Sequence, residues 1–375
     1  MNFGFTDEQE LLRAEVRKFL DENASLEEVR KQVEVDSGFD PKLWKQMAEL
    51  GFVGLSIPEE HGGAGLDLVT LLVLLEETGR TLLPSPLVSN VVASKAIQHF
   101  GDEEQCARWL PGLANGSLIG TFALLEQGDD LSPEGLSLEG KLDGEETILH
   151  GRKLFVPDAG KADLFVVAFR RGGAGDDYGL AVVERQSEGV SAADSPAMDL
   201  TKRQGSLELN DVRVPRNGIL AESGGGWSAI QRLIDLGAAL VTAESVGAAE
   251  GALEITTSFA KEREQFDAKI GRYQGVKHPL AEMYVDIESY KSLVYYAFWA
   301  LDEGAEDAAV AISRAKAYAS ETFPMLGING VQLHGGVGYT WEYDIQLYLK
   351  RGKWMRPMYG DADYHYDRIA QLGGL

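Results

Sequence analysis

Hydrophobic side chains recur at helical spacing through the first third of the chain. After Thr6, the apolar positions that share one helical face are Leu11, Leu12, Val16, Phe19 and Leu20. Gln9 follows Thr6 at the spacing that predicts a capping box at the start of this helix. Glycine and proline interrupt the helical pattern at 51–67, and the apolar run at 68–80 resumes it. We therefore expect helices up to about residue 118.

The pattern then changes to short apolar runs separated by turn residues. Apolar runs occupy 164–169 and 179–184, and a segment rich in Gly and Asp lies between them. Residues 205–215 alternate between hydrophobic and polar side chains at every second position, which is typical of a half-buried strand. The region from about 119 to 222 therefore predicts a small β domain of sandwich or barrel type.

Helical spacing returns after the glycine-rich segment 221–227. Apolar residues step by three and four along one helix at Leu280, Met283, Ile287, Tyr290, Val294, Ala297 and Leu301. An earlier stretch carries a small-residue face that would let two helices approach closely, made of Ala239, Ala243, Val246, Gly247 and Ala249. Both features predict a helical bundle in the last part of the chain.

The order of helices, strands and helices predicts an α+β chain of three domains. We place a helical domain at 1–118, a β-sandwich or barrel domain at 119–222 and a helical bundle at 223–375. No apolar run is long enough to span a membrane, and the first residues do not resemble a secretory signal. Cys106 is the only cysteine and cannot form an internal disulfide, which favours a cytoplasmic protein.

The charge and the motifs exclude some classes of function. A net charge of −24 disfavours binding to nucleic acid or to an anionic membrane. The chain has no Walker A sequence and no HExxH, and its six histidines show no metal-ligand spacing. We therefore expect no metal, no nucleic acid and no membrane among its partners.

Two segments carry candidate binding chemistry. Residues 329–344, "NGVQLHGGVGYTWEYD", place four glycines within nine positions. Such a loop either joins two helices or lets backbone amides approach a phosphate. Upstream, the Arg263 guanidinium suits a pyrophosphate, and the Phe266 ring suits an adenine or flavin ring. Each residue alone could be structural, and their combination with Gln274 favours a nucleotide site.

Several segments together resemble a known family. They are "GFVGLSIPEEHGGAGLD" (51–67), "REQFDAKIGRYQGVKHPLAEM" (263–283), "GVQLHGGVGYTWEYDIQLYLKR" (330–351) and "MYGDADYHYDRIA" (358–370). In these motifs, and in its helix–strand–helix order, essentially the whole chain resembles the flavin-dependent acyl-CoA dehydrogenases. The resemblance implies an N-terminal helical domain, a central β domain and a C-terminal four-helix bundle, with FAD lying between subunits.

The resemblance also implies roles for individual residues. The residues that would hold the FAD of a neighbouring subunit are Arg263, Phe266, Gln274, Gln332, Gly335 and Gly336. In the β domain, the family's flavin stretch corresponds to 125–132, which begins at Leu125, and Phe155 stands where the family packs a tryptophan on the flavin. Asp235 matches an aspartate that contacts the CoA end of the substrate.

The chain departs from the family at the catalytic base. The usual glutamate of the tail motif is Gly360, and a second family location for the base is Gly237. Asp361 could act as the base after a shift of one residue, with Asp363 two positions further on. The same "GDAD" segment could instead be a helix N-cap. The other candidates for the base are Glu244, Glu126 or a carboxylate from a partner.

The resemblance implies an FAD-dependent dehydrogenase that desaturates an acyl-CoA between its α and β carbons. Electrons would pass to an electron-transfer flavoprotein, and the chain would form a homo-oligomer or a heteromer with a related subunit. An alternative is a redox-silent subunit that lends its half of the FAD site to a catalytic partner. A flavin enzyme of altered chemistry, such as a monooxygenase or desulfinase, is a third interpretation. We expect an oligomer because the Leu280–Leu301 seam and the shared cofactor site would both need a partner.

Overall fold

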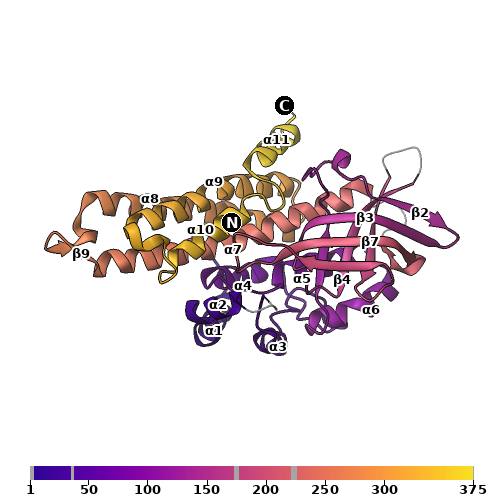
Figure 1. Cartoon of the computed structure of the whole chain (residues 1–375), viewed down its shortest axis with the longest axis horizontal. Coiled ribbons are helices and arrows are strands. Elements are labelled where there is room, and N and C mark those ends of the chain that lie inside the picture. The colour runs from indigo at the N-terminus through magenta and orange to yellow at the C-terminus, as the bar shows by residue number, and fades with distance from the viewer. Residues whose placement is uncertain (1–3, 35–37, 173–176, 221–225, 375) are drawn as a thin grey trace. The chain divides into compact units, whose positions relative to one another are not determined.

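A computed structural model describes residues 4–34, 38–172, 177–220 and 226–374, and Figure 1 labels its main elements. The first part is helical as expected. Its α-helices are α1 (Asp7–Asn23), α2 (Leu26–Val33), α3 (Pro41–Glu49), α4 (Leu68–Arg80), α5 (Leu87–Phe100) and α6 (Glu103–Ala114), and a short 3-10 helix η1 covers Glu59–His61.

The strands of the central region form one mixed sheet. They are β1 (Gly120–Ala123), β2 (Glu139–Asp143), β3 (Glu146–Pro157), β4 (Leu164–Arg171), β5 (Tyr178–Glu184), β6 (Val190–Asp194), β7 (Gln204–Pro215) and β8 (Ile219–Leu220). Among the described residues the order is β6-β7-β3-β2-β4-β5-β8, and β1 pairs in parallel with β4. Only two residue pairs join β2 to β4, so the sheet consists of two well-paired halves with a short connection. The strands predicted at 164–169, 179–184 and 205–215 are confirmed.

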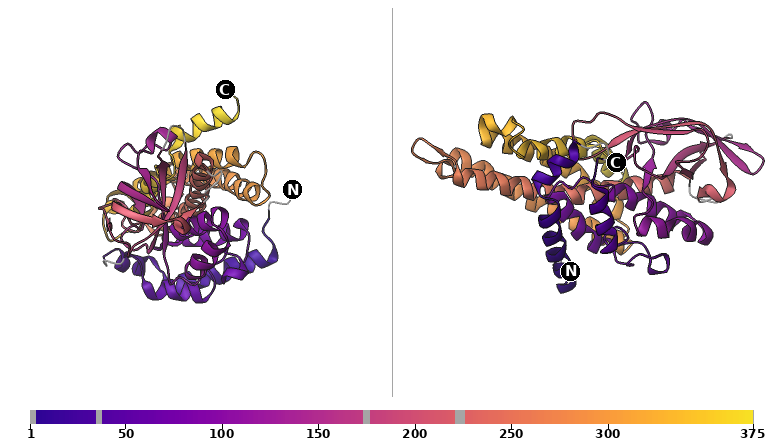
Figure 2. Two further views of the ribbon diagram at one scale, coloured as in Figure 1. Left: turned by 90° about the vertical axis from the view of Figure 1, so that its right-hand side faces the viewer. Right: turned by 60° about the horizontal axis from the view of Figure 1, so that its bottom comes forward.

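Long helices make up the last part of the chain. They are α7 (Gly226–Glu262), α8 (Gln274–Asp302), α9 (Ala308–His334), α10 (Ile345–Met355) and α11 (Ala362–Leu372). A two-stranded hairpin, β9 (Glu264–Gln265) with β10 (Ala268–Lys269), follows α7. Further 3-10 helices are η2 (Pro133–Gly135), η3 (Arg216–Gly218), η4 (Ile270–Arg272) and η5 (Gly335–Tyr339). Helices α8 and α9 pack side by side, and the hairpin lies at their far end in Figures 1 and 2.

The chain forms two compact units that are not continuous in sequence. One contains Met1–Glu34, Asp67–Pro84 and Ala238–Leu375, and the other contains Val35–Leu66 and Ser85–Gly237. We call them the helical unit and the sheet unit. The domain boundaries at 118/119 and 222/223 follow secondary-structure type and stay a prediction, and the second lies outside the described residues.

Local signals in the sequence account for the ends of the early helices. The Thr6 side chain accepts the Gln9 backbone N–H, and the Gln9 side chain accepts the Thr6 N–H, so the predicted capping box is confirmed. Helix α4 begins and ends at the residues of the predicted apolar run, and Asp67 caps its start. Among the described residues, no helix is long and apolar enough to cross a membrane.

Glycines allow α4 and α7 to cross closely within the helical unit. A Cβ on Gly79 would lie 1.9 Å from the Glu244 carbonyl oxygen, and one on Gly247 would lie 1.7 Å from the Glu76 carbonyl oxygen. Only a residue without a side chain fits at such distances. The small-residue face predicted around Gly247 is therefore a contact between helices of the same chain.

The Leu280–Leu301 seam is also filled by the chain itself, which corrects one reason for expecting an oligomer. Met283, Ile287 and Tyr290 are at most 1% exposed within the single chain. The Tyr290 hydroxyl donates to the Ser245 carbonyl oxygen at 2.8 Å. Helices α4, α7 and α9 bury the seam, because an apolar stripe at this spacing can be covered by any neighbouring helix. The seam therefore gives no argument for a partner.

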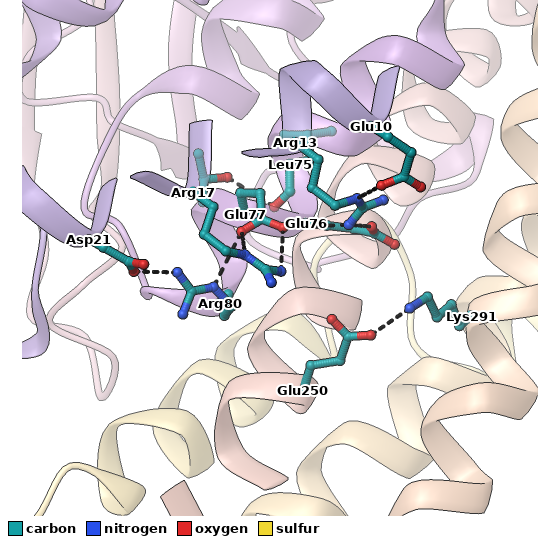
Figure 3. A network of polar contacts seen from close by, with 11 residues as sticks. Glu10, Arg13, Arg17, Asp21, Leu75, Glu76, Glu77, Arg80, Glu250 and Lys291 are labelled. Carbon is teal, nitrogen blue, oxygen red and sulfur yellow. Dashed lines mark hydrogen bonds and ion pairs between the residues drawn. The ribbon is translucent and has the colours of Figure 1, made fainter. Parts of the chain in front are cut away.

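A network of ion pairs fastens α1 to α4 (Figure 3). Arg13 donates to Glu76 at 2.7 Å, and Arg17 donates to both carboxylate oxygens of Glu77. Both glutamates are 1% exposed, so the arginines supply the countercharges that buried carboxylates require. Burial still raises the pKa of Glu76 to about 7, although Arg13 opposes the shift. The network therefore contributes to the fold of the helical unit.

Candidate functional site

The hairpin at the end of the helical unit exposes two of the expected nucleotide-binding residues. Phe266 and Asp267 form its turn with φ of 54° and 58°, so both are in the left-handed region typical of a type I′ turn. This region is costly for a phenylalanine. The Phe266 side chain is 89% exposed, and the Arg263 guanidinium makes no ion pair with any described residue. The hairpin and the residue before it therefore offer an exposed aromatic ring and a cation that forms no ion pair with the described residues.

The glycine-rich loop lies at the same end of the helical unit. The Phe259 ring stacks on His334, with centroids 4.3 Å apart, and joins the end of α7 to the end of α9. Gly335 follows directly with a φ of 65°. Open space surrounds the position that a Cβ would take on Gly335 or on Gly336. The loop backbone is therefore accessible to a ligand on that side.

The antiparallel packing of α8 and α9 brings Gln274 to this end as well. Tyr290 of α8 lies beside Tyr318 of α9, with ring centroids 6.5 Å apart. Gln274 precedes Tyr290 by as many residues as His334 follows Tyr318. Because both helices rise equally per residue, Gln274 and His334 lie at the same height along the antiparallel pair. Gln274 and Gln332 are both exposed there. The structure thus brings the six candidates from 263–274 and 332–336 to one end of the bundle.

The chemistry of this end fits the nucleotide part of FAD. A pyrophosphate is an anion that takes N–H donors, and Arg263 supplies an uncommitted guanidinium. The Gly335 backbone N–H donates to the Gln332 carbonyl oxygen, and the open space at the Cβ positions of Gly335 and Gly336 lets a ligand approach the loop backbone closely. The exposed Phe266 ring can cover an aromatic ring system.

In the sheet unit, the two candidate flavin residues lie on adjacent segments. The Leu154 backbone N–H donates to the Leu125 carbonyl oxygen at 2.8 Å, which places Leu125 beside the residue that precedes Phe155. Phe155 has a φ of 51° and is half exposed. A cavity of about 740 Å³ opens next to them, lined by Glu126, Leu154 and Arg152 among other residues. Leu125 and Phe155 are therefore sequence neighbours of cavity-lining residues, Glu126 and Leu154, on two segments that a hydrogen bond joins.

A buried ion pair holds these two segments together. The Lys153 ammonium is fully buried, and it donates to Glu126 at 2.7 Å and to the Leu124 carbonyl oxygen at 3.0 Å. Glu126 also accepts from the Leu138 backbone N–H and from the Ser137 hydroxyl. Although burial opposes it, the Lys153 charge and these donors lower the pKa of Glu126. Its oxygens are already bonded, so Glu126 is poorly placed to take a substrate proton.

The tail turn contains the vacated base position. Asp361 is the N-cap of α11, and its carboxylate accepts the Tyr364 backbone N–H at 3.1 Å. Gly360 has a φ of 98°, which a residue with a side chain rarely adopts. The Gly360 carbonyl oxygen accepts a hydrogen bond from the buried Lys316 ammonium at 2.6 Å. This geometry is that of a helix start, and the Asp361 carboxylate is engaged in it.

The other candidates are buried along α7. Asp235 is 8% exposed, and one of its oxygens accepts from the Gln231 side chain at 3.2 Å in the sheet unit. Glu244 is 2% exposed in the helical unit, at the close crossing with Gly79. Gly237 leaves the second family base position without a carboxylate. Among the described residues, no cluster of His, Cys, Asp and Glu could hold a metal ion.

Two lysines of these sites were not found by reasoning from the sequence. Lys153 and Lys316 are both fully buried, and each bonds to backbone carbonyl oxygens beside a candidate residue. The signal was present for Lys316, because it shares a helical face with Ile312 and Phe323, both of which are buried. A lysine inside an apolar face requires hydrogen-bond acceptors for its ammonium group. For Lys316 these acceptors include carbonyl oxygens of the tail turn.

Comparisons with known proteins agree with this arrangement. A family model described as "Acyl-CoA dehydrogenase, N-terminal domain" matches residues 6–117, and one described as "Acyl-CoA dehydrogenase, C-terminal domain" matches 224–373. The chain is 33% identical to "Acyl-CoA dehydrogenase IpdE2" of Mycolicibacterium smegmatis, and the match covers 92% of both chains. It is 31% identical to "Caffeyl-CoA reductase-Etf complex subunit CarC" of Acetobacterium woodii, over 91% of this chain and 92% of that one.

A solved structure shares the fold over its whole length. The structure of the "ChsE4-ChsE5 complex" from Mycobacterium tuberculosis matches with a TM-score of 0.91 and 26% identity, over 100% of this chain and 99% of that one. The chain belongs to the acyl-CoA dehydrogenase family. It is an oxidoreductase of acyl-CoA thioesters in a family whose members are FAD-dependent flavoproteins.

Proposed function

We propose that this chain works as one subunit of a heteromeric acyl-CoA dehydrogenase. The assembly desaturates an acyl-CoA between its α and β carbons and passes the electrons to an electron-transfer flavoprotein. In it, this chain supplies nucleotide-binding residues, and a related subunit supplies the catalytic base. One observation carries the proposal: both usual base positions are glycine, Gly237 and Gly360, while all six residues expected to bind FAD are present at the exposed end of the bundle. Two relatives support the partners, since one is named as part of an Etf complex and one structure contains two unlike chains.

Two of the candidate carboxylates are engaged in structure. Asp361 caps α11, and Glu126 is bonded to Lys153 and to two further donors. A general base needs an oxygen that can reach the substrate proton. Restoring that function within this chain would require breaking one of these contacts. A carboxylate from another subunit avoids this cost.

The residues of this chain then have three tasks. Arg263 binds the pyrophosphate of FAD, the loop at Gly335 and Gly336 lets the backbone approach it closely, and Phe266 covers its adenine or flavin ring. Leu125 and Phe155 line the flavin ring in the sheet unit, where FAD accepts a hydride from the substrate when bound. Asp235 contacts the CoA end of the thioester. Because Cys106 is free and buried, the chain needs no oxidising compartment, and we place the assembly in the cytoplasm.

An exposed apolar face of the bundle supports the need for a partner. Tyr284 and Val285 of α8 are exposed, as are Met325 and Ile328 of α9. Tyr284 precedes Tyr290 by about as much as Met325 follows Tyr318, so the packing of Tyr290 on Tyr318 places the two pairs at one level. Exposed apolar side chains that gather on one surface are typical of an interface, and these four lie at one level of two packed helices.

The test compares the chain alone with the chain co-expressed with a neighbouring dehydrogenase gene product. We expect the purified chain alone to be colourless or weakly yellow. The co-purified complex should carry FAD, and its absorbance should bleach anaerobically when acyl-CoA thioesters of varied chain are added. A yellow chain that bleaches alone would show a self-sufficient enzyme and overturn the proposal. In that case the change Asp361→Asn in the lone chain identifies its base.

A further inference from the structure

The turn before α11 has no room for a side chain at the vacated base position. A Cβ on Gly360 would lie 2.3 Å from Cδ1 of Tyr364 and 2.9 Å from Nε2 of His365. Real Cβ contacts are not that short, so the Tyr364 ring would have to move. Tyr359 and Gly360 are both in the left-handed region, with φ of 55° and 98°. The backbone therefore takes a path that suits glycine and excludes the glutamate of the family.

Buried donors hold this path from two sides. Lys316 is 0% exposed, and its ammonium donates to the Gly360 carbonyl oxygen at 2.6 Å and to the Arg356 carbonyl oxygen at 2.9 Å. Its third proton goes to the Ser320 hydroxyl at 2.8 Å. The ring of His365, also 0% exposed, makes a hydrogen bond with the Tyr359 carbonyl oxygen at 3.0 Å. Each side chain spans from a helix to the turn, because α9 carries Lys316 and α11 carries His365.

Most backbone carbonyl oxygens of the turn accept a hydrogen bond. The carbonyl oxygens of residues 356, 359, 360 and 361 all accept a hydrogen bond, the last from the His365 backbone N–H. Buried carbonyl groups without a donor are costly, so removing one donor destabilises the turn as a whole. The tail is also tied to α9 on its outer side, where the Tyr366 hydroxyl donates to Glu321.

We propose that Lys316 is a positioning residue that locks the Tyr359–Gly360 turn, and that Tyr364 fills the space of the missing base. This inference about the turn, which we call the lock, rests on the proposed function and explains why the chain needs a base from another subunit. The absence of a base in this chain is built into the local fold, so a glutamate placed at position 360 does not restore activity. The base has to come from another subunit, because no single substitution at this position can return it.

The first experiment places a side chain in the locked turn. We compare Gly360→Glu and Gly360→Ala with the double variant Gly360→Glu/Tyr364→Ala, all in the full chain. Both single variants should lower the melting temperature by several degrees, because the Cβ meets the Tyr364 ring whatever follows it. The double variant should recover only the part of this loss that the Tyr364 ring causes, because the positive φ of residue 360 and the His365 contact remain. If Gly360→Glu melts like the parent, or bleaches its flavin with an acyl-CoA, the position is open and the proposal is wrong.

The second experiment tests Lys316 itself by cleavage with chymotrypsin after Tyr359. Lys316→Met should be cut at least tenfold faster than the parent, because the turn loses its donor. Lys353→Met is the control, since Lys353 is exposed on neighbouring α10 and should leave the rate unchanged. A Lys316→Met variant that resists cleavage like the parent would show that the lysine does not position the turn.

A pH profile separates positioning from general destabilisation. Burial lowers the pKa of Lys316 to about 7, with Asp361 opposing the shift and Arg356 adding to it, and His365 lies close by. Opening the turn returns the lysine to its ordinary pKa, so the closed turn gains stability as pH rises above about 7. The neutral amine keeps two N–H donors for the Gly360 and Arg356 carbonyl oxygens and can accept from the Ser320 hydroxyl. Cleavage of the parent, corrected for protease activity with a peptide, should therefore slow between about pH 7 and 9. Lys316→Met should show no such slope, and a slope equal to that of the parent would contradict the proposal.

The two proposals fail in different ways. A lone parent chain that bleaches with an acyl-CoA overturns the heteromer and leaves the melting and cleavage results of the lock unaffected. A heteromer that works as proposed, together with a Gly360→Glu variant that is as stable as the parent, overturns the lock alone.

Discussion

The two regions expected to bind FAD are built in opposite ways. In the sheet unit, Leu125 and Phe155 lie on segments that are fixed by the buried Lys153–Glu126 pair. At the end of the helical unit, Arg263 has no ion-pair partner among the described residues and Phe266 is almost fully exposed. The first region is complete within one chain. The second exposes groups that gain their contacts only when a cofactor or another chain arrives, so its residues are the ones to test for binding.

The largest expected effect is on the sheet side. Glu126→Gln keeps an amide oxygen beside the buried Lys153 ammonium but removes its countercharge, and leaving a buried charge uncompensated in this way costs about 3–5 kcal/mol. Urea unfolding measures the loss, and Glu134→Gln in the same loop is the exposed control. A loss below about 1 kcal/mol, as for an exposed pair, would mean that the loop is not held by this pair.

The same variant has a pH signature. The pKa of Glu126 is lowered in the folded chain, so its contribution to stability is present above the ordinary glutamate value of 4.5 and is lost as pH falls through the lowered value. The parent should therefore lose this part of its stability in acid, below about pH 4.5. Glu126→Gln should lack it, and identical acid profiles for the two proteins would contradict the assignment.

The next largest effect is expected on FAD binding at the exposed end of the helical unit. Arg263→Ala removes a charge-assisted hydrogen bond to the pyrophosphate, worth about 1.5–3 kcal/mol, so FAD should dissociate about tenfold more readily or worse. The flavin retained by the complex after gel filtration measures it. Arg314→Ala is the control, because Arg314 is an exposed arginine on α9 away from the loop. Equal retention by both variants would remove Arg263 from the site.

A smaller effect is expected at the hairpin, where two variants distinguish a change in stability from a change in FAD affinity. Phe266→Gly relieves a left-handed phenylalanine and should stabilise the chain without FAD by about 1 kcal/mol. It also removes the ring, so FAD affinity should fall. Asp267→Gly relieves the neighbouring left-handed residue and should stabilise the chain without lowering FAD affinity. If the two variants bind FAD alike, the Phe266 ring makes no contact with the cofactor.

The smallest expected effect concerns Asp361. Asparagine caps a helix about as well as aspartate, so Asp361→Asn should change stability by only a few tenths of a kcal/mol, whereas Asp361→Ala should cost about 1 kcal/mol. Anaerobic flavin reduction by the heteromer should stay near normal with Asp361→Asn. A loss of several orders of magnitude with intact folding would identify Asp361 as the base and would reverse our preference for a partner's carboxylate.

The sequence by itself determined the elements and the class of protein. Helix α4 and strands β4, β5 and β7 could be predicted because the spacing of apolar residues and the flanking caps are local signals. The linked motifs around Arg263 and Gly335 indicated the family, since residue type and order are enough for that. The two glycines at the usual base positions could also be seen without a structure.

Only the tertiary structure decided which side chains are committed. The apolar pattern of Leu280–Leu301 does not tell whether helices of this chain or of another chain bury it. In the structure, α4, α7 and α9 of the same chain bury it. Lys316 and Gly360 are far apart in sequence, so no local pattern could pair them, and the same holds for Lys153 and Glu126. Compact units that combine distant segments bring such donors and acceptors together, because burial forces each polar group to find a partner.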